Sequence, residues 1–199
     1  MPYRLRKKED KGKEVLEVFH KGERCMPKAI LFDLGDTLLV EEPGLSGKKH
    51  IWEIDFKRVP GAEEVLRELR HRYKLAVVTN TVTSREPQVR LALRRAGIEE
   101  YFDAVVTSVD VGANKPESAP FLEALRRLGA LPSEAIMVGN RLDTDILGAK
   151  RLGMKAVLLR REGSIEDKKE PRSPEEAPDY VIDSLRKLPE ILKLMEGVS

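Results

Sequence analysis

The sequence predicts an α/β fold in which a doubly wound parallel sheet is covered by helices on both faces. From residue 28 onward, short runs of four or five apolar residues alternate with helical stripes of apolar residues. Each run is apolar without alternation, which is typical of strands buried on both faces. Strand–helix alternation implies right-handed crossovers and a parallel sheet. Ligands of such domains bind outside the carboxyl ends of the strands.

The predicted elements follow one another with short connections. Helices are predicted at 62–69 and around 87–96, where Pro87 lies near the start and Gly97 ends the stripe. Further helices are predicted at 119–128, 144–152 and 188–195, the first two of these ending at Gly129 and Gly153. The predicted strands are 29–32, 75–78, 104–106, 135–138 and 156–159, with an edge strand at 180–182.

Three segments lie outside this strand–helix pattern. Residues 1–27 form an N-terminal extension, and an alternating patch at 15–19 predicts an extra strand or hairpin there. Residues 38–58 are predicted to form a β-hairpin flap, with a turn at Pro43-Gly44 and with Trp52, Ile54 and Phe56 on one face. Residues 161–178 are charged and contain proline, which predicts a mobile loop. We therefore expect an extension followed by one core domain over 28–199.

Composition limits the class of protein. A chain of 199 residues suits one well-buried domain, and its formal net charge of +2 gives no global argument for nucleic acid or a membrane surface. The sequence has no run of about 18 apolar residues and no visible signal peptide. Cys25, the only cysteine, excludes an internal disulfide and suits a reducing cytoplasm. Few amides beside many charged residues suggest a thermophile.

Polar residues gather where the predicted strands end. Because parallel strands present their carboxyl ends at one edge of the sheet, we expect these side chains to converge there. The set combines carboxylates, two hydroxyls, two amides and an ammonium group. It comprises Asp33, Gly35, Asp36 and Thr37 after the first strand, Thr79 and Asn80 at the second, Lys115 after the third, and Asn140, Asp143 and Asp145 after the fourth.

This constellation resembles the haloacid dehalogenase (HAD) superfamily, over residues 29–160 and, with the last strand and helix, through 195. The four motifs occur in the family's order, each at the expected strand end. The resemblance implies a Rossmann-like core and an aspartyl-phosphate on Asp33, formed by in-line attack. It also implies Mg²⁺ bound by Asp33 and the Gly35 carbonyl, with Asn140 and Asp145 in the acidic motif. Thr79 and Asn80 would hold the phosphoryl oxygens, and Lys115 would neutralise charge.

Each of these residues also has a structural explanation. Asp33 and Asp145 could cap helices, and Asp143 is better explained as a surface or capping acid than as a ligand. Thr79 could simply end a strand. Lys115 could be a surface lysine before a helix.

The sequence departs from the family pattern beside the nucleophile. Phosphatases of the family usually carry a second Asp two residues after the nucleophile as general acid, but this position is Gly35, and Asp36 stands next to it. General acid catalysis contributes roughly 10²–10⁴-fold, so its loss would matter most for poor leaving groups. Either Asp36 replaces the acid, or the substrate is an aryl or acyl phosphate that needs no proton. In the second case the rate would depend steeply on the pKa of the leaving group.

Two further departures concern the metal and the cap. Asn140 stands where relatives usually have a metal-ligating Asp, which predicts weaker Mg²⁺ binding, partly offset by Asp145. Few residues separate the first motif from the helix at 62, so a hairpin flap fits there but a large cap domain does not. An open site suits a macromolecular phosphate, or a small substrate enclosed by a neighbouring subunit or by the N-terminal segment.

Three functions remain open from the sequence. The leading hypothesis is a Mg²⁺-dependent phosphohydrolase acting on a phosphomonoester. A phosphotransferase would keep the nucleophile but pass the phosphoryl group to another acceptor. A catalytically degenerate member would bind a phosphate-bearing ligand or a protein partner without turnover. Each hypothesis gives the protein a phosphorylated ligand or a protein partner, and a homo-oligomer is possible in each.

Overall fold

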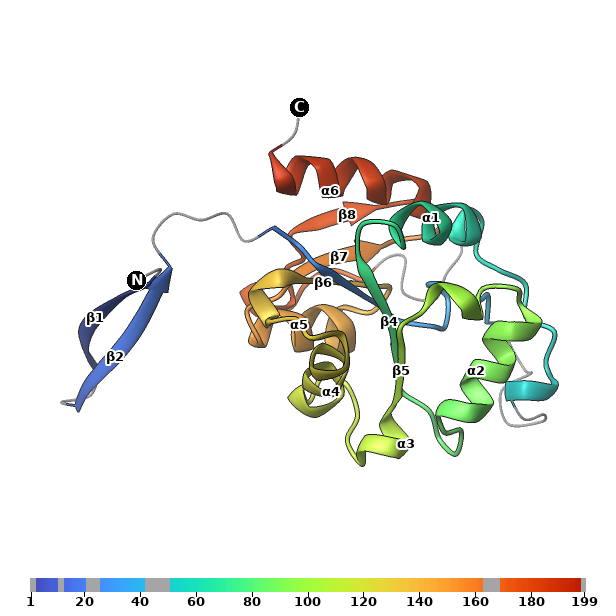
Figure 1. Ribbon diagram of the computed structural model, residues 1–199, viewed down its shortest axis with the longest axis horizontal. Coiled ribbons are helices and arrows are strands. Elements are labelled where there is room, and N and C mark those ends of the chain that lie inside the picture. Colours follow the sequence, from blue (N-terminus) through green and yellow to red (C-terminus); the bar gives the residue numbers. More distant parts are fainter. Residues whose placement is uncertain (1–2, 11–12, 21–25, 42–50, 163–168, 198–199) are drawn as a thin grey trace.

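Two sheets are present in the parts of the chain that the computed structural model describes, which are residues 3–10, 13–20, 26–41, 51–162 and 169–197 (Figure 1). The larger sheet has the strand order β5-β4-β3-β6-β7-β8, and all neighbouring pairs are parallel. Its central strand β3 lies between β4 and β6. This confirms the predicted doubly wound fold. The strands are β3 (Ala29–Phe32), β4 (Lys74–Thr79), β5 (Ala104–Thr107), β6 (Ala135–Gly139), β7 (Lys155–Leu159) and β8 (Tyr180–Ile182).

Helices cover both faces of this sheet. Successive side chains of a strand point to opposite faces, so Ile30 and Phe32 join one apolar cluster and Ala29 and Leu31 join the other. The first cluster includes residues of α1 (Ala62–Leu69), α2 (Glu86–Arg95) and α6 (Leu188–Glu196). The second includes residues of α4 (Ser118–Leu128) and α5 (Leu147–Arg151). The strands are therefore buried on both sides, as their continuous apolar sequences predicted.

Several short helical turns complete the described chain. The predicted helix at 144–152 begins as a π-helical turn over Leu142–Ile146 and continues as α5. The sequence did not predict α3 (Ser108–Val111), which Thr107 caps by accepting a hydrogen bond from the backbone of Asp110. Single turns of 3-10 helix lie at Ile51–Glu53, Glu99–Tyr101, Pro132–Glu134, Pro174–Glu176 and Leu185–Lys187. Of the helices in the described ranges, none has the length and apolar character needed to cross a bilayer.

The N-terminal extension contains an antiparallel pair of strands, β1 (Tyr3–Asp10) and β2 (Lys13–His20). The pairing confirms the alternative in which the patch at 15–19 belongs to a hairpin. This two-stranded sheet is separate from the six-stranded one.

The predicted hairpin flap over 38–58 is wrong in its second arm. Leu39 bridges to Arg58, and two backbone hydrogen bonds join 38–40 to 57–59, but Ile51–Glu53 is 3-10 helix. The alternation of Trp52, Ile54 and Phe56 arises from one-sided packing: Ile54 is buried, and the other two are half-buried. The predicted turn at 43–44 lies outside the described residues. In the loop predicted over 161–178, the described part includes the 3-10 turn at Pro174–Glu176, whose buried Glu176 accepts hydrogen bonds from Arg172.

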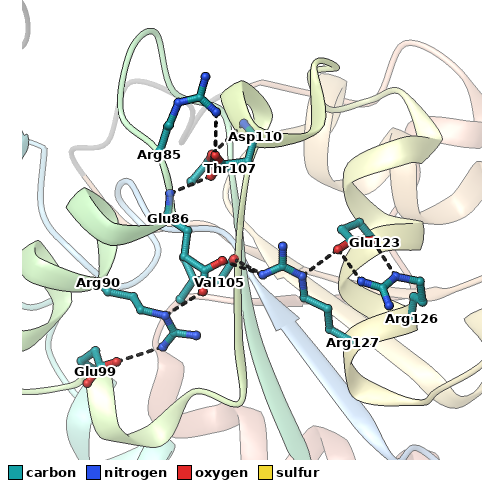
Figure 2. Close-up of polar contacts among 10 residues, drawn as sticks. All are labelled: Arg85, Glu86, Arg90, Glu99, Val105, Thr107, Asp110, Glu123, Arg126 and Arg127. Atoms are coloured by element: carbon teal, nitrogen blue, oxygen red, sulfur yellow. Dashed lines mark hydrogen bonds and ion pairs between the residues drawn. The ribbon is translucent and has the colours of Figure 1, made fainter.

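Charged side chains lie beside β5, one of the two edge strands of the six-stranded sheet (Figure 2). Arg127 of α4 donates to the carbonyl of Val105 and pairs with Glu86 of α2 at 2.6 Å and with Glu123 at 2.7 Å. Glu86 also pairs with Arg90. Because α2 and α4 lie on opposite faces of the sheet, this network joins the two helical layers across the edge strand.

Candidate active site

An ion triad lies at the carboxyl ends of β3 and β6, with one lysine between two carboxylates. Asp33 directly follows β3, Asp145 lies in the π-helical turn after β6, and Lys115 precedes α4. Lys115 Nζ is 2.5 Å from Asp33 Oδ1 and 2.7 Å from Asp145 Oδ1. The exposed fractions of Asp33, Lys115 and Asp145 are 8%, 3% and 0%. With all three groups ionised, the triad carries one net negative charge and favours a further cation nearby.

Hydrogen bonds hold both the side chain and the backbone of Lys115. Its Nζ donates to the carbonyl of Val78 at 2.7 Å. Its backbone N–H donates to Asn80 Oδ1 at 2.8 Å, and its carbonyl accepts from Asn80 Nδ2 at 3.0 Å. The Asn80 side chain therefore acts as a clamp that ties the loop before α4 to the end of β4. These hydrogen bonds restrict the conformations of Lys115 and keep its ammonium group in the triad.

The electrostatics of the triad follow from burial and pairing. Burial alone would lower the pKa of Lys115, but the facing carboxylates of Asp145 and Asp33 outweigh it and raise the pKa. Burial raises the pKa of Asp145, Lys115 opposes this shift, and repulsion from Asp33 adds to it. Lys115 is therefore held as a cation, and a second cation would favour ionised Asp145.

Thr37 brings an oxygen of Asp33 and an oxygen of Asn140 toward one point. The Thr37 hydroxyl is fully buried and lies 3.4 Å from Asp33 Oδ2 and 3.5 Å from Asn140 Oδ1. The Asp33 carboxylate is thus divided: Oδ1 faces Lys115, while Oδ2 faces Thr37 and Asn140.

The oxygen atoms at this edge fit a hard divalent cation. Oδ1 of Asp145 is buried and, apart from its ion pair with Lys115, receives no hydrogen bond from any described residue. Asp145 also acts as a cap, because its Oδ2 accepts from the backbone N–H of Arg141 at 3.1 Å. The described residues contain no group of three or more His, Cys, Asp and Glu placed to hold a metal ion. Two carboxylates with an amide oxygen and a backbone carbonyl nevertheless suit Mg²⁺, which keeps several waters and takes only one or two carboxylates.

Thr79 and Asn80 lie at the end of β4, beside the strand that delivers Asp33. Thr79 is buried and ends β4, while Asn80 is exposed. The loop that follows is tied to the neighbouring strand end, because Thr81 N donates to Ser108 Oγ at 2.9 Å and Ser108 Oγ donates to the Thr81 carbonyl at 3.1 Å.

Asp36 lies beside the site but is bound to other groups. Its Oδ1 accepts from Arg161 Nη2 at 2.7 Å and from the backbone N–H of Glu41 at 3.2 Å. The backbone of Asp36 has φ of 54°, a left-handed conformation that glycine adopts more easily. The Asp36 carboxylate therefore anchors the loop after β3 to the residues after β7.

The carboxylate of Glu41 lies against Gly35. A Cβ atom built on Gly35 would lie 2.7 Å from Cδ of Glu41 and would overlap its Oε1. Although part of Glu41 is exposed to solvent, partial withdrawal from water raises the pKa of its carboxyl group, and repulsion from Asp36 and Asp33 adds to the shift. Arg141 opposes the shift. The space that a side chain at position 35 would need is occupied by Glu41.

The structure places several features that sequence reasoning missed. Thr37 was listed with the first motif, but its contacts with Asp33 and Asn140 were not predicted. The Asn80 clamp and the hydrogen bonds between Thr81 and Ser108 could not be predicted from the sequence, because single polar residues at strand ends are common. Glu41 and Arg161 lie in irregular segments, where no periodicity indicates which way a side chain points. Asp143 is partly exposed and paired with Arg141, as expected of a surface acid.

Comparison with known proteins finds phosphatases that are similar to this chain in sequence. The glyceraldehyde 3-phosphate phosphatase of Methanopyrus kandleri is 41% identical over 138 residues, covering 69% of this chain and 57% of that protein. The ribulose-1,5-bisphosphate 5-phosphatase of Halopiger xanaduensis is 36% identical over 138 residues, covering 67% of this chain and 56% of that protein. The chain thus spans somewhat more than half the length of these relatives.

Solved structures show the same architecture. The HAD phosphatase of Thermococcus onnurineus superimposes with a TM-score of 0.66 at 30% identity, over 83% of this chain and 97% of that one. The haloacid dehalogenase-like hydrolase family matches residues 46–159, a range that includes Thr79, Lys115, Asn140 and Asp145 and begins after Asp33. Because this match covers more than half of the sequence, the chain belongs to the haloacid dehalogenase-like hydrolases.

Proposed function

We propose that the chain is a Mg²⁺-dependent phosphomonoesterase that works through an aspartyl-phosphate on Asp33. The observation that supports this most is the buried triad, in which Lys115 lies 2.5 Å from Asp33 and 2.7 Å from Asp145. A buried carboxylate pair is costly, and the arrangement leaves one Asp33 oxygen beside the cation-binding groups and the other beside Lys115.

The residues divide the work of phosphoryl transfer. Asp33 attacks phosphorus in line, and the bond to the leaving oxygen breaks. Lys115 and the Thr79 hydroxyl, with the backbone at Asn80, hold phosphoryl oxygens and offset their negative charge. The Gly35 carbonyl, Asn140 and Asp145 are the groups that would hold Mg²⁺ together with Asp33. When bound, this ion supplies positive charge that offsets repulsion between the carboxylate and the phosphoryl group.

The relatives suggest the kind of substrate. The two phosphatases named above act, by their names, on glyceraldehyde 3-phosphate and on the 5-phosphate of ribulose 1,5-bisphosphate. We infer for this chain a small phosphorylated polyol or sugar with a primary phosphate ester. Such a substrate releases a poor leaving group, which needs a proton.

Two other functions keep part of this site. A phosphotransferase would use the same Asp33 and differ only in the acceptor of the second step. A degenerate binding module has no evident need for a buried lysine that neutralises two carboxylates, so the intact triad favours catalysis. The neutral amide of Asn140 provides less negative charge than an aspartate would, and we expect modest Mg²⁺ affinity.

The decisive experiment is hydrolysis of p-nitrophenyl phosphate with and without Mg²⁺, at moderate and elevated temperature. Asp33→Asn is the matched control, because it keeps the size of the side chain and removes the nucleophile. We expect Mg²⁺-dependent release of phosphate that the variant lacks, and phosphorylated protein that hydroxylamine cleaves. Mg²⁺ binding without turnover in the folded wild-type chain would instead favour the binding module.

A further inference from the structure

The carboxylate of Glu41 lies against the backbone of Gly35, two residues after the proposed nucleophile. Its Oε1 overlaps the position of a Cβ on Gly35, so it lies no farther from that point than a carboxylate oxygen of an aspartate lies from its own Cβ. Glu41 thus delivers a carboxylate to the place that an acid at position 35 would occupy.

The Glu41 carboxylate has no assigned structural partner. No hydrogen bond or ion pair to its side-chain oxygens is found among the described residues, whereas Asp36 beside it is bound by Arg161. The backbone of Glu41 is fixed, because its N–H donates to Asp36 Oδ1 at 3.2 Å. An anchored backbone with an exposed residue whose carboxylate has no partner among the described residues suits a group that exchanges protons with a ligand.

We propose that Glu41 is the general acid and base of the reaction, in place of the acid missing at position 35. This inference rests on the proposed phosphatase function. In the first step an Asp33 oxygen bonds to phosphorus, the ester bond breaks, and the proton of the Glu41 carboxyl passes to the departing oxygen to give the free alcohol. In the second step the Glu41 carboxylate takes a proton from water as the water oxygen attacks phosphorus. The bond to Asp33 breaks, phosphate leaves, and Asp33 and protonated Glu41 are restored.

This assignment also separates Glu41 from Asp36. Asp36 follows Gly35 directly, but Arg161 holds it through two contacts, one to its carboxylate and one to its carbonyl, and the atoms nearest a Cβ on Gly35 belong to Glu41. If Asp36 were the acid, its carboxylate would have to leave Arg161. The Glu41 carboxylate already lies at Gly35 and needs no such movement.

The test compares two substrates that differ in their need for a proton. kcat/KM is measured for wild type and Glu41→Gln with p-nitrophenyl phosphate, a good leaving group, and with glyceraldehyde 3-phosphate or glycerol 3-phosphate, which release alkoxides. We expect Glu41→Gln to lower kcat/KM by about 10²–10⁴-fold for the alkyl esters and by less than about threefold for the aryl ester. Glu100→Gln, an exposed substitution away from the site, serves as the matched control and leaves both values unchanged.

A transplant of the acid provides a second readout. Gly35→Asp alone places its side chain on the Glu41 carboxylate and is expected to be impaired. Glu41→Ala removes both the acid and the obstruction. On the alkyl esters, kcat/KM of the double variant Gly35→Asp/Glu41→Ala should be at least tenfold higher than that of Glu41→Ala.

The outcomes separate this inference from the function on which it rests. Equal losses on both substrates in Glu41→Gln, or no loss on either, would overturn the role of Glu41 while leaving the Asp33 chemistry intact. A wild-type chain that hydrolyses neither substrate would overturn the phosphatase itself. Selective loss on alkyl esters together with recovery in the double variant supports the proposal.

Discussion

Basic residues join carboxylates in two regions of this molecule, and the regions differ in how much water reaches the charges. At the edge of β5, Arg90, Arg126 and Arg127 pair with acids whose side chains remain about a quarter exposed (Figure 2). In the triad, the side chains of Lys115 and Asp145 are 2% and 0% exposed. Exposed pairs contribute little because water competes with them, whereas separating a buried pair leaves a charge without compensation. The edge network therefore stabilises modestly, and the triad is better explained by chemistry than by stability.

Removal of the central cation is expected to give the largest difference between the regions. Lys115→Met leaves Asp33 and Asp145 buried without their partner, which should cost roughly 3–5 kcal/mol in the free energy of unfolding. Its loss from the proposed phosphoryl-binding site should lower kcat by about 10²–10³-fold. Urea unfolding and steady-state kinetics measure the two effects.

The matched change at the β5 edge is Arg127→Met, which removes a cation that joins α2 to α4. We expect a loss of about 1 kcal/mol and unchanged kinetics, since the pairs are partly exposed. A similar loss of stability in both variants would contradict the distinction between the two regions.

Gly→Ala substitutions at two crowded positions, one beside the triad and one beside the Phe121 ring, compare the triad with another buried part of the molecule. A Cβ on Gly139 would lie 2.6 Å from Cβ of Asp145, and one on Gly148 would lie 2.5 Å from the Phe121 ring. Each Gly→Ala change should cost about 1–3 kcal/mol through overpacking. Gly139→Ala should reduce activity more, because it displaces a member of the triad directly, whereas a Cβ on Gly148 approaches only the Phe121 ring and, at 3.2 Å, the backbone of Pro116 next to Lys115. Thermal unfolding and kcat/KM for both variants test this, and a fully active Gly139→Ala would contradict it.

Asp36 provides a smaller effect that sharpens the assignment of the acid. Asp36→Asn keeps a residue that tolerates positive φ and weakens the pair with Arg161. We expect kcat/KM on an alkyl phosphate to fall by less than about tenfold, below the roughly 10²–10⁴-fold loss of a general acid. A loss in the larger range, spared with p-nitrophenyl phosphate, would assign the proton to Asp36 instead.

The smallest expected effect is the response of the edge network to acid. Hydrogen bonds from Arg126 and Arg127 lower the pKa of Glu123 to about 2. Since the folded pKa lies below the ordinary value of 4.5, the stabilisation is present above that value and is lost as the pH falls toward 2. Glu123→Gln should therefore cost at most about 1 kcal/mol at pH 7 and almost nothing near pH 2. Urea unfolding at both pH values measures the difference, and an equal cost at both would exclude this linkage.

The sequence predicted the regular part of the fold because burial on both faces gives a strand a continuous apolar sequence. The runs at 29–32 and 180–182 match β3 and β8 residue for residue. It also predicted that Asp33, Lys115 and Asp145 lie together, since parallel strands end at one edge. The second arm of the flap was wrong, because Ile51–Glu53 is 3-10 helix and the alternation at 52–56 reflects which side chains are buried rather than strand pairing. Glu41 and Arg161 could not be predicted, since their directions depend on the path of irregular backbone.

The strand order also governs when the site can form during synthesis. β3 emerges early, yet its neighbour β6 is made only about a hundred residues later, and Thr37 lies 103 positions before Asn140 in the chain. Until β6 leaves the ribosome, one edge of β3 has no partner, and long-range parallel pairing is slow. Residues 135–145 then give β3 its second neighbour and bring Asn140 and Asp145 to the site in one event, while β7 and β8 extend the sheet afterwards.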